Sequence, residues 1–201
     1  MAQRRVVAST STPSRLPAGV RRVPLVTHVD GRGSFTELFR EEWDIGVAPV
    51  QWNAVRSDPG VLRGSHVHVS HRDYLIVLSG GAQVFLHDLR RGSATEGQNA
   101  VVDLTGERLE ALVVPTGIAH AFWFSEPSLH VYAVSEYWDP DGELGCHWSD
   151  PELGLPTFAE LPHVSQRDDG LPPLSVLRAQ VEGAQPFASS ATTTPAASPD
   201  P

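Results

Sequence analysis

Between residues 22 and 165 the chain is divided into short apolar runs, each of which ends at turn residues. The clearest runs are 74–78, 83–86, 112–114, 121–124 and 129–136, and glycine, proline and serine stand between them. Runs this short and this regularly interrupted are typical of all-β sandwiches and barrels. Several are apolar at every position, as in strands that are covered on both faces. We therefore expect an all-β sandwich that closes into a small barrel, whose interior is filled or holds one small ligand.

Helical patterns are weak and the two ends of the chain lack any periodicity. A short helix is indicated over 36–43, and another over 174–181, where apolar residues fall on one side. Residues 1–18 and 183–201 are rich in small and polar residues, which predicts two disordered tails. This leaves a single domain over 19–182.

Composition excludes several classes of function. The net charge of -9 argues against nucleic acid or an anionic membrane as a partner. No apolar run is long enough to span a bilayer, and the charged N-terminal stretch does not resemble a secretory signal. Cys146 is the single cysteine, so no internal disulfide forms, and we expect a cytoplasmic protein. The chain contains no lysine, which excludes Schiff-base chemistry.

Polar side chains recur on one face of two of the expected strands. Because side chains alternate between faces along a strand, His66 and His68 share a face, as do His130 and Tyr132. Burying an imidazole or a phenol without a partner costs about 1–3 kcal/mol, so these residues indicate a polar pocket in the barrel. Four further histidines are interpreted as ordinary core or surface residues: His28, His87, His147 and His163.

Two stretches resemble the motifs of the cupin superfamily. His66, His68, Asp73 and Gly80 follow the spacing of the first motif, with aspartate where glutamate is usual. Pro115-Thr116-Gly117-Ile118-Ala119-His120 follows the second. The resemblance implies a cupin double-stranded β-helix, that is, a jelly-roll barrel with a few short helices and a polar pocket.

From about residue 22 to 180 the chain resembles the dTDP-4-dehydrorhamnose 3,5-epimerase family. The resemblance implies an isomerase that epimerises a dTDP-4-keto-6-deoxyhexose at C3, C5 or both, in deoxysugar biosynthesis. It also implies a homodimer and no cofactor. The segments that carry it are 30–37 (DGRGSFTE), 51–53 (QWN), 61–66 (VLRGSH), 88–93 (DLRRGS), 114–122 (VPTGIAHAF), 148–154 (WSDPELG) and 165–168 (SQRD).

The family resemblance implies a role for individual residues. His66 would be the general base, oriented by Asp168, and Tyr132 would be the general acid across the pocket. An imidazole suits removal of a proton beside a ketone at neutral pH, and a carboxylate on its far nitrogen fixes the tautomer. Substrate-binding roles fall to Arg32, Phe35, Glu37, Gln51, Asn53, Arg63, His120 and Trp138, with Phe35 and Glu37 supplied by an exchanged strand of the homodimer.

One position departs from the family pattern and leaves two alternatives open. Asp73 stands where the family has a lysine. For a charge that develops 4 Å away, exchanging this cation for an anion changes the electrostatic energy by roughly several kcal/mol. Another cation, such as Arg72 or a protonated His68 or His71, would have to take over, or the activity is altered. Alternatively, the chain is a metal-dependent cupin enzyme whose ligands are His66, His68, Asp73 and His120, or a non-catalytic cupin that binds a nucleotide sugar.

Overall fold

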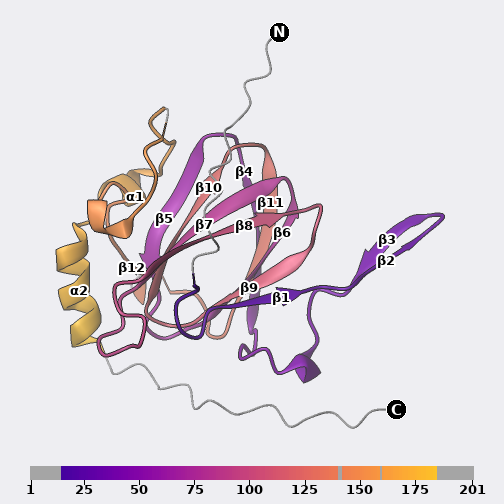
Figure 1. Cartoon of the computed structure of the whole chain (residues 1–201), viewed down its shortest axis with the longest axis horizontal. Coiled ribbons are helices and arrows are strands. Elements are labelled where there is room, and N and C mark those ends of the chain that lie inside the picture. The colour runs from indigo at the N-terminus through magenta and orange to yellow at the C-terminus, as the bar shows by residue number, and fades with distance from the viewer. Residues whose placement is uncertain (1–14, 140–141, 159, 185–201) are drawn as a thin grey trace.

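The computed structural model describes residues 15–139, 142–158 and 160–184, and in this part of the chain two sheets face each other (Figure 1). Every strand pair is antiparallel. The first sheet has the order β1 (Arg21–Pro24), β9 (Glu110–Val114), β6 (Asp73–Ser79), β11 (Ser128–Val134), β4 (Gln51–Ser57). The second has the order β12 (Leu144–Gly145), β5 (Val61–Val67), β10 (Ile118–Phe124), β7 (Gly81–Asp88), β8 (Asn99–Thr105).

The apolar runs are continuous because both faces of the central strands are buried. In β6, Leu75 and Val77 belong to the core between the sheets. Tyr74 and Ile76, on the opposite face, pack in a second cluster outside the first sheet. The expected all-β class and the jelly-roll sandwich are confirmed.

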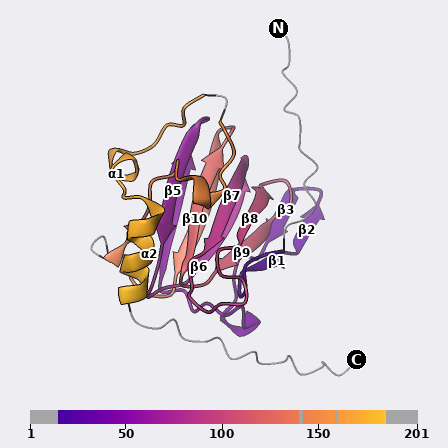
Figure 2. The same ribbon diagram turned by 60° about the vertical axis from the view of Figure 1, so that its left-hand side comes forward.

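The outer face of the second sheet is covered by a helix. Helix α2 (Leu174–Gly183) buries Leu174, Leu177 and Val181, and they pack with Val67 of β5. Figure 2 shows α2 lying beside β5 at this end of the sheet. The helix expected over 174–181 is therefore confirmed.

The helix expected over 36–43 is wrong for most of its length. Thr36 ends strand β3, and only the 3₁₀ turn η1 (Glu41–Trp43) is helical. The hydroxyl of Tyr74 donates a hydrogen bond of 2.6 Å to the Leu38 carbonyl, so that carbonyl is already used by a side chain. Burial of this segment on the outer face of the first sheet therefore overrides its weak helical pattern.

A glycine allows strands β5 and β10, which carry His66 and His120, to approach closely. Gly64 of β5 has a φ of 109°, and a Cβ there would lie 2.6 Å from the carbonyl oxygen of His120. Any larger residue would push β5 away from β10. The close pairing brings His66 into register with His120 across the two strands.

Strands β2 (Thr27–Asp30) and β3 (Gly33–Thr36) form a hairpin that extends away from the sandwich (Figure 1). Residues 15–18, at the end of the expected N-terminal tail, contact the body: the amide of Ala18 donates to Thr95 Oγ1 at 2.8 Å. Gly183, the first residue of the expected C-terminal tail, is the last residue of α2, so that tail begins later than predicted. Residues 1–14 and 185–201 of the expected tails lie outside the described residues. Among the described residues, no helix is both long and apolar enough to cross a membrane.

Candidate active site

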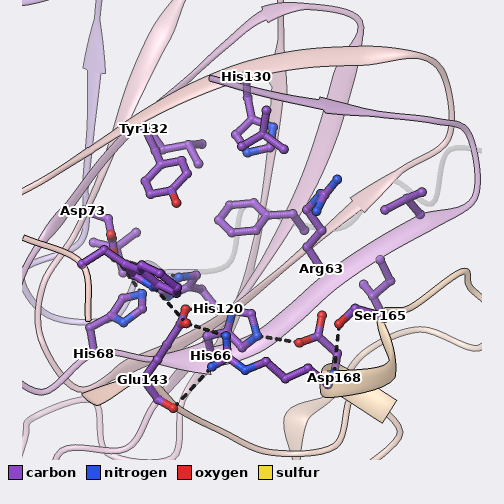
Figure 3. A pocket seen from close by; sticks show the side chains of 18 of the residues that line it. Arg63, His66, His68, Asp73, His120, His130, Tyr132, Glu143, Ser165 and Asp168 are labelled. Atoms are coloured by element: carbon purple, nitrogen blue, oxygen red, sulfur yellow. Dashed lines mark hydrogen bonds and ion pairs between the residues drawn. The ribbon is translucent and has the colours of Figure 1, made fainter. Parts of the chain in front are cut away.

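A cavity of about 320 Å³ opens between the two sheets, where polar side chains of both gather. Strands β5, β10 and β11 and the segment 163–168 contribute to its wall. Figure 3 shows these side chains directed toward one another. Six of the predicted site residues line the cavity: Arg63, His66, His120, Tyr132, Trp138 and Asp168.

His66 and Asp168 form a close pair although they are far apart in the sequence. His66 Nε2 lies 2.8 Å from Asp168 Oδ1. Asp168 is held in the short helix α1 (Gln166–Asp169), whose N-cap Ser165 accepts a hydrogen bond from the Asp168 amide at 3.1 Å. The Gly64 amide donates to Asp168 Oδ2 at 3.3 Å.

The environment keeps Asp168 ionised. Burial acts to raise the pKa of Asp168, but the hydrogen bond and charge of His66 and the other donors outweigh it and leave the pKa below 3.8. An ionised carboxylate only accepts hydrogen bonds, so His66 Nε2 carries the proton of this contact. In the neutral form of the imidazole, Nδ1 is then the nitrogen that carries the lone pair.

Glu143 is a second carboxylate beside this imidazole, and sequence reasoning missed it. Its Oε1 lies 3.5 Å from His66 Nδ1, while Oε2 accepts hydrogen bonds from Trp138 Nε1 at 3.0 Å and Arg167 at 2.6 Å. Burial acts to raise the pKa of Glu143, but His66, Arg167 and Trp138 lower it overall. The residue lies just before β12 and belongs to no strand or helix, so no periodicity pointed to it. Arg167 falls inside a family segment but received no role.

The Tyr132 hydroxyl points into the cavity from β11 (Figure 3). Burial raises the pKa of Tyr132, and the neighbouring carboxyl groups of Asp73 and Glu143 act in the same direction. The phenol is therefore neutral at pH 7 and can donate a proton. Neutral charge and position both suit the role of general acid that the resemblance implies.

Asp73 is buried on the cavity wall among three histidines. Its carboxylate oxygens lie 3.6 Å from His68 Nε2, 3.7 Å from His71 Nε2 and 3.9 Å from His120 Nε2. Burial raises the pKa of Asp73 well above 3.8. Burial also lowers the pKa of His68 and His71, and lowers that of His120 to about 4, so these imidazoles are neutral at pH 7.

The side chains expected to replace the missing lysine charge therefore do not supply it. His68 and His71 are neutral because protonation would place a charge in a buried site. Arg72 does not line the cavity, and its guanidinium donates to the Gly46 carbonyl at 2.7 Å. Within the described residues, Arg63 and Arg167 are the arginines that do line the cavity.

Two predicted binding residues lie on β4, next to the cavity and not on its wall. Gln51 donates to Asn53 Oδ1 at 3.0 Å and accepts from the backbone amide of Trp138 at 3.1 Å. Asn53 is the register partner of Tyr132, and its Nδ2 is buried with no hydrogen-bond partner in the part of the chain that the structure describes. Arg63 is oriented by Ser57, whose Oγ accepts from its Nε at 3.0 Å.

The structure does not bring the three hairpin residues to the cavity of their own chain. Arg32 pairs with Asp30 at 2.6 Å, and Glu37 pairs with Arg40. Phe35 is 63% exposed on the hairpin. Their predicted role depends on an exchanged strand and therefore on a second copy of the chain.

One histidine interpreted as ordinary lies at the site. His163 lines the cavity and bridges to Val61 of β5. An isolated histidine in a loop carries no periodic signal, so its position could not be derived from the pattern. His87 and His147 do bond locally, to Asn99 and Ser149, as a structural role requires.

Comparisons with known proteins agree with this geometry. A family model described as dTDP-4-dehydrorhamnose 3,5-epimerase matches residues 17–175. The chain is 35% identical over 148 residues to the dTDP-4-dehydrorhamnose 3,5-epimerase of Pseudomonas aeruginosa, covering 69% of this chain and 82% of that one. It is 32% identical over 162 residues to a dTDP-4-dehydro-6-deoxyglucose 3-epimerase of a Streptomyces species, covering 75% and 82%.

A solved structure shares the fold over most of the chain. It is the dTDP-6-deoxy-D-glucose-3,5-epimerase of Legionella pneumophila in complex with dTDP-4-keto-L-rhamnose, with a TM-score of 0.77 and 29% identity. The match covers 84% of this chain and 94% of that one. The pattern of motifs, the jelly-roll and the family match agree, and the chain belongs to the dTDP-4-dehydrorhamnose 3,5-epimerase family.

Proposed function

We propose that this protein is an isomerase that epimerises a dTDP-4-keto-6-deoxyhexose in deoxysugar biosynthesis. The observation that carries the proposal is the His66–Asp168 pair, 2.8 Å apart, in a cavity that Tyr132 also lines. The family membership supports the reaction class. The reaction removes and returns a proton on a carbon beside the ketone.

His66 takes the proton in this proposal. The ionised Asp168 holds the Nε2 proton, so the lone pair of Nδ1 is the base. The same carboxylate stabilises the imidazolium that forms. Removal of the proton leaves an enolate, whose oxygen needs a cation or a hydrogen-bond donor.

Tyr132 returns a proton to the other face of the sugar. Its phenol is neutral because burial raises its pKa, so the proton is available throughout the neutral range. Inversion requires the donor and the base to approach the carbon from different sides of the ring, and in support the two residues stand on different sheets, Tyr132 on β11 and His66 on β5. General acid and base groups of this kind each contribute about 10²–10⁴ in rate.

Arginine and amide side chains would bind the nucleotide and sugar. Arg63 and Arg167 offer fork-shaped donors that suit a pyrophosphate. The Nδ2 of Asn53, on β4 beside Tyr132, has no hydrogen-bond partner among the described residues, so a ligand that reaches it would gain this donor. His120 and Trp138 lie on the wall where the sugar would rest.

The experiment that tests the function uses the full-length chain and dTDP-4-keto-6-deoxyglucose in heavy water. Proton NMR of the sugar follows deuterium at C3 and C5. We expect deuterium at C3, at C5 or at both, together with an inverted product. Saturable binding without exchange at either carbon would instead identify a non-catalytic nucleotide-sugar binder.

We also propose that the protein works as a homodimer whose β2–β3 hairpins are exchanged. Val29 is 78% exposed and Phe35 63% exposed on this hairpin, and a lone two-stranded hairpin is marginally stable in water. A partner surface would cover both side chains and place Phe35 and Glu37, with Arg32, near the partner's nucleotide. Phe35→Ser should shift the mass measured by light scattering from dimer toward monomer; an unchanged dimer would contradict the exchange.

Two further expectations remain part of the proposal. The chain acts as a single domain over 19–182, and its work is cytoplasmic. In support, Cys146 is buried and free, so the fold depends on no disulfide and suits a reducing compartment.

A further inference from the structure

The wall of the cavity holds a second polar cluster, distinct from the His66–Asp168 pair. It consists of His68, Asp73 and His120, which are 8%, 6% and 5% exposed. One possible ligand atom from each residue lies within 4.8 Å of the other two. Figure 3 shows the three side chains gathered on one side of the cavity.

The distances within this cluster are too long for hydrogen bonds. Asp73 Oδ2 lies 3.6 Å from His68 Nε2 and 3.9 Å from His120 Nε2. Bonds of about 2.0–2.2 Å to a shared ion would separate its ligand atoms by roughly 3–4 Å. The spacing therefore suits groups that surround an ion better than groups that bond one another.

The tautomer of His120 also prepares it for a cation. Its Nδ1 lies 3.1 Å from the Ile118 carbonyl oxygen, which can only accept, so Nδ1 carries the proton. The lone pair of Nε2 then faces Asp73. A backbone carbonyl on the far nitrogen is one of the partners by which proteins orient a metal-binding histidine.

A buried ring nitrogen without a partner belongs to the same cluster. His68 is more than nine-tenths buried, and its Nδ1, the nitrogen other than the one near Asp73, has no hydrogen-bond partner among the described residues. His71 stacks on the His68 ring at 4.0 Å and lies 3.7 Å from the other oxygen of Asp73. The cluster thus contains more buried polar atoms than its own contacts satisfy.

We propose that His68, Asp73 and His120 bind one divalent first-row cation such as Zn²⁺, Mn²⁺ or Ni²⁺. Two imidazoles and one carboxylate are a ligand set for these ions and leave positions open toward the cavity. The catalytic role of the cation rests on the proposed function: the cation supplies, beside the enolate oxygen, the positive charge that the family's lysine would provide. The catalysis without a cofactor implied by the family resemblance would not hold for this chain.

This arrangement leaves His66 free to act as the base. A metal cupin that used His66 as a ligand would lose its base, because a bound imidazole has no lone pair for a proton. Here Asp168 holds His66 at 2.8 Å, and the other three groups form their own cluster. Cation binding and proton removal are therefore compatible in one cavity.

The binding test uses the full-length protein after dialysis against a chelator. Zn²⁺, Mn²⁺ and Ni²⁺ are titrated separately by calorimetry, and bound metal is counted by mass spectrometry. We expect one site per chain for at least one ion. Asp73→Asn and His120→Gln should each weaken the affinity for the ion by more than about 100-fold. This is a larger loss than that caused by removing a residue that only hydrogen-bonds to a ligand.

Two variants serve as controls for position. His130→Gln alters another buried cavity histidine and should leave cation affinity unchanged, as should His66→Ala. Circular dichroism melts check that each variant folds. Absence of saturable binding by folded wild-type protein overturns the proposal, and so does a loss in His66→Ala as large as that in Asp73→Asn.

The catalytic part is tested by deuterium exchange with and without the bound ion. We expect exchange to fall about 100-fold after chelation and to recover when the ion is restored. Exchange that chelation does not change overturns the catalytic role of the cation while the proposed function stands. If one ion binds but no form of the protein exchanges deuterium, the cation site stands and the proposed function is overturned.

Discussion

Replacing Asp168 with asparagine should convert His66 into the wrong tautomer with little change in shape. In the variant, the amide oxygen can take the place of Asp168 Oδ2 and accept from the Gly64 amide, while the amide nitrogen faces His66 Nε2 at the present 2.8 Å contact. An amide nitrogen donates, so Nε2 must accept and the proton moves to Nδ1. The base then has no lone pair for the substrate.

The size of the loss follows from this change. Where a histidine base is held in the wrong tautomer by the same substitution, catalysis falls about 10⁴-fold. We expect deuterium exchange from heavy water into the keto sugar to fall by about 10³–10⁴, or about 4–5.5 kcal/mol in the barrier. NMR time courses at fixed enzyme concentration measure the rate directly.

A matched control tests whether position matters. Asp169 is the next residue, and its carboxylate lies 3.6 Å from His147, away from His66. Asp169→Asn removes the same charge from the same helix and should keep the exchange rate within about twofold. A rate for Asp168→Asn within tenfold of the wild type would refute the reasoning about the tautomer.

Three further substitutions are expected to behave as follows. Tyr132→Phe should still exchange deuterium through the base but yield much less inverted product, as measured by NMR; wild-type inversion would exclude the phenol as the acid. Gly64→Ala should lower the melting temperature by about 6–12 °C, for a clash and strain of about 3 kcal/mol, whereas Gly92→Ala, with a positive φ and open space, should cost less. Asp88 accepts hydrogen bonds from Arg90, Ser93 and Thr95; burial acts to raise its pKa, but these bonds leave it below 3.8. The stabilisation by ionised Asp88 is therefore complete above pH 3.8 and is lost as the pH falls through the lower pKa of the folded state. The melting temperatures of Asp88→Asn and wild type should differ at pH 7 and converge in acid. A difference that does not change with pH would contradict this account.

Local pattern predicted the strands because burial decides which positions are apolar. In β6, Leu75 and Ile76 pack in cores on opposite sides of one sheet, and the run is apolar for that reason. The segment 36–43 was misread because its helical pattern is weak and because Leu38, Phe39 and Trp43 are partly buried against the cluster that contains Tyr74, a contact made far along the chain. Periodicity carries no information about such long-range contacts.

The site residues also fall into those that local pattern predicted and those that it could not. The shared face of His66 and His68 follows from alternation, whereas Asp168 was placed beside His66 by family resemblance alone. Glu143 lies in a loop without periodicity, so the carboxylate 3.5 Å from His66 went unpredicted. The lost charge at Asp73 was visible in the sequence, but the neutral state of His68 and His71 depends on burial that only the fold reveals.

The central claim is that the imidazole of His66 removes the proton beside the ketone. Its most direct test is single-turnover exchange of the C3 and C5 protons of dTDP-4-keto-6-deoxyglucose in heavy water, with wild type and His66→Ala compared at saturating enzyme. The account predicts deuterium at one or both carbons with the wild type and none above the uncatalysed rate with the variant, although the variant still binds the nucleotide. Exchange at the wild-type rate in His66→Ala would contradict it.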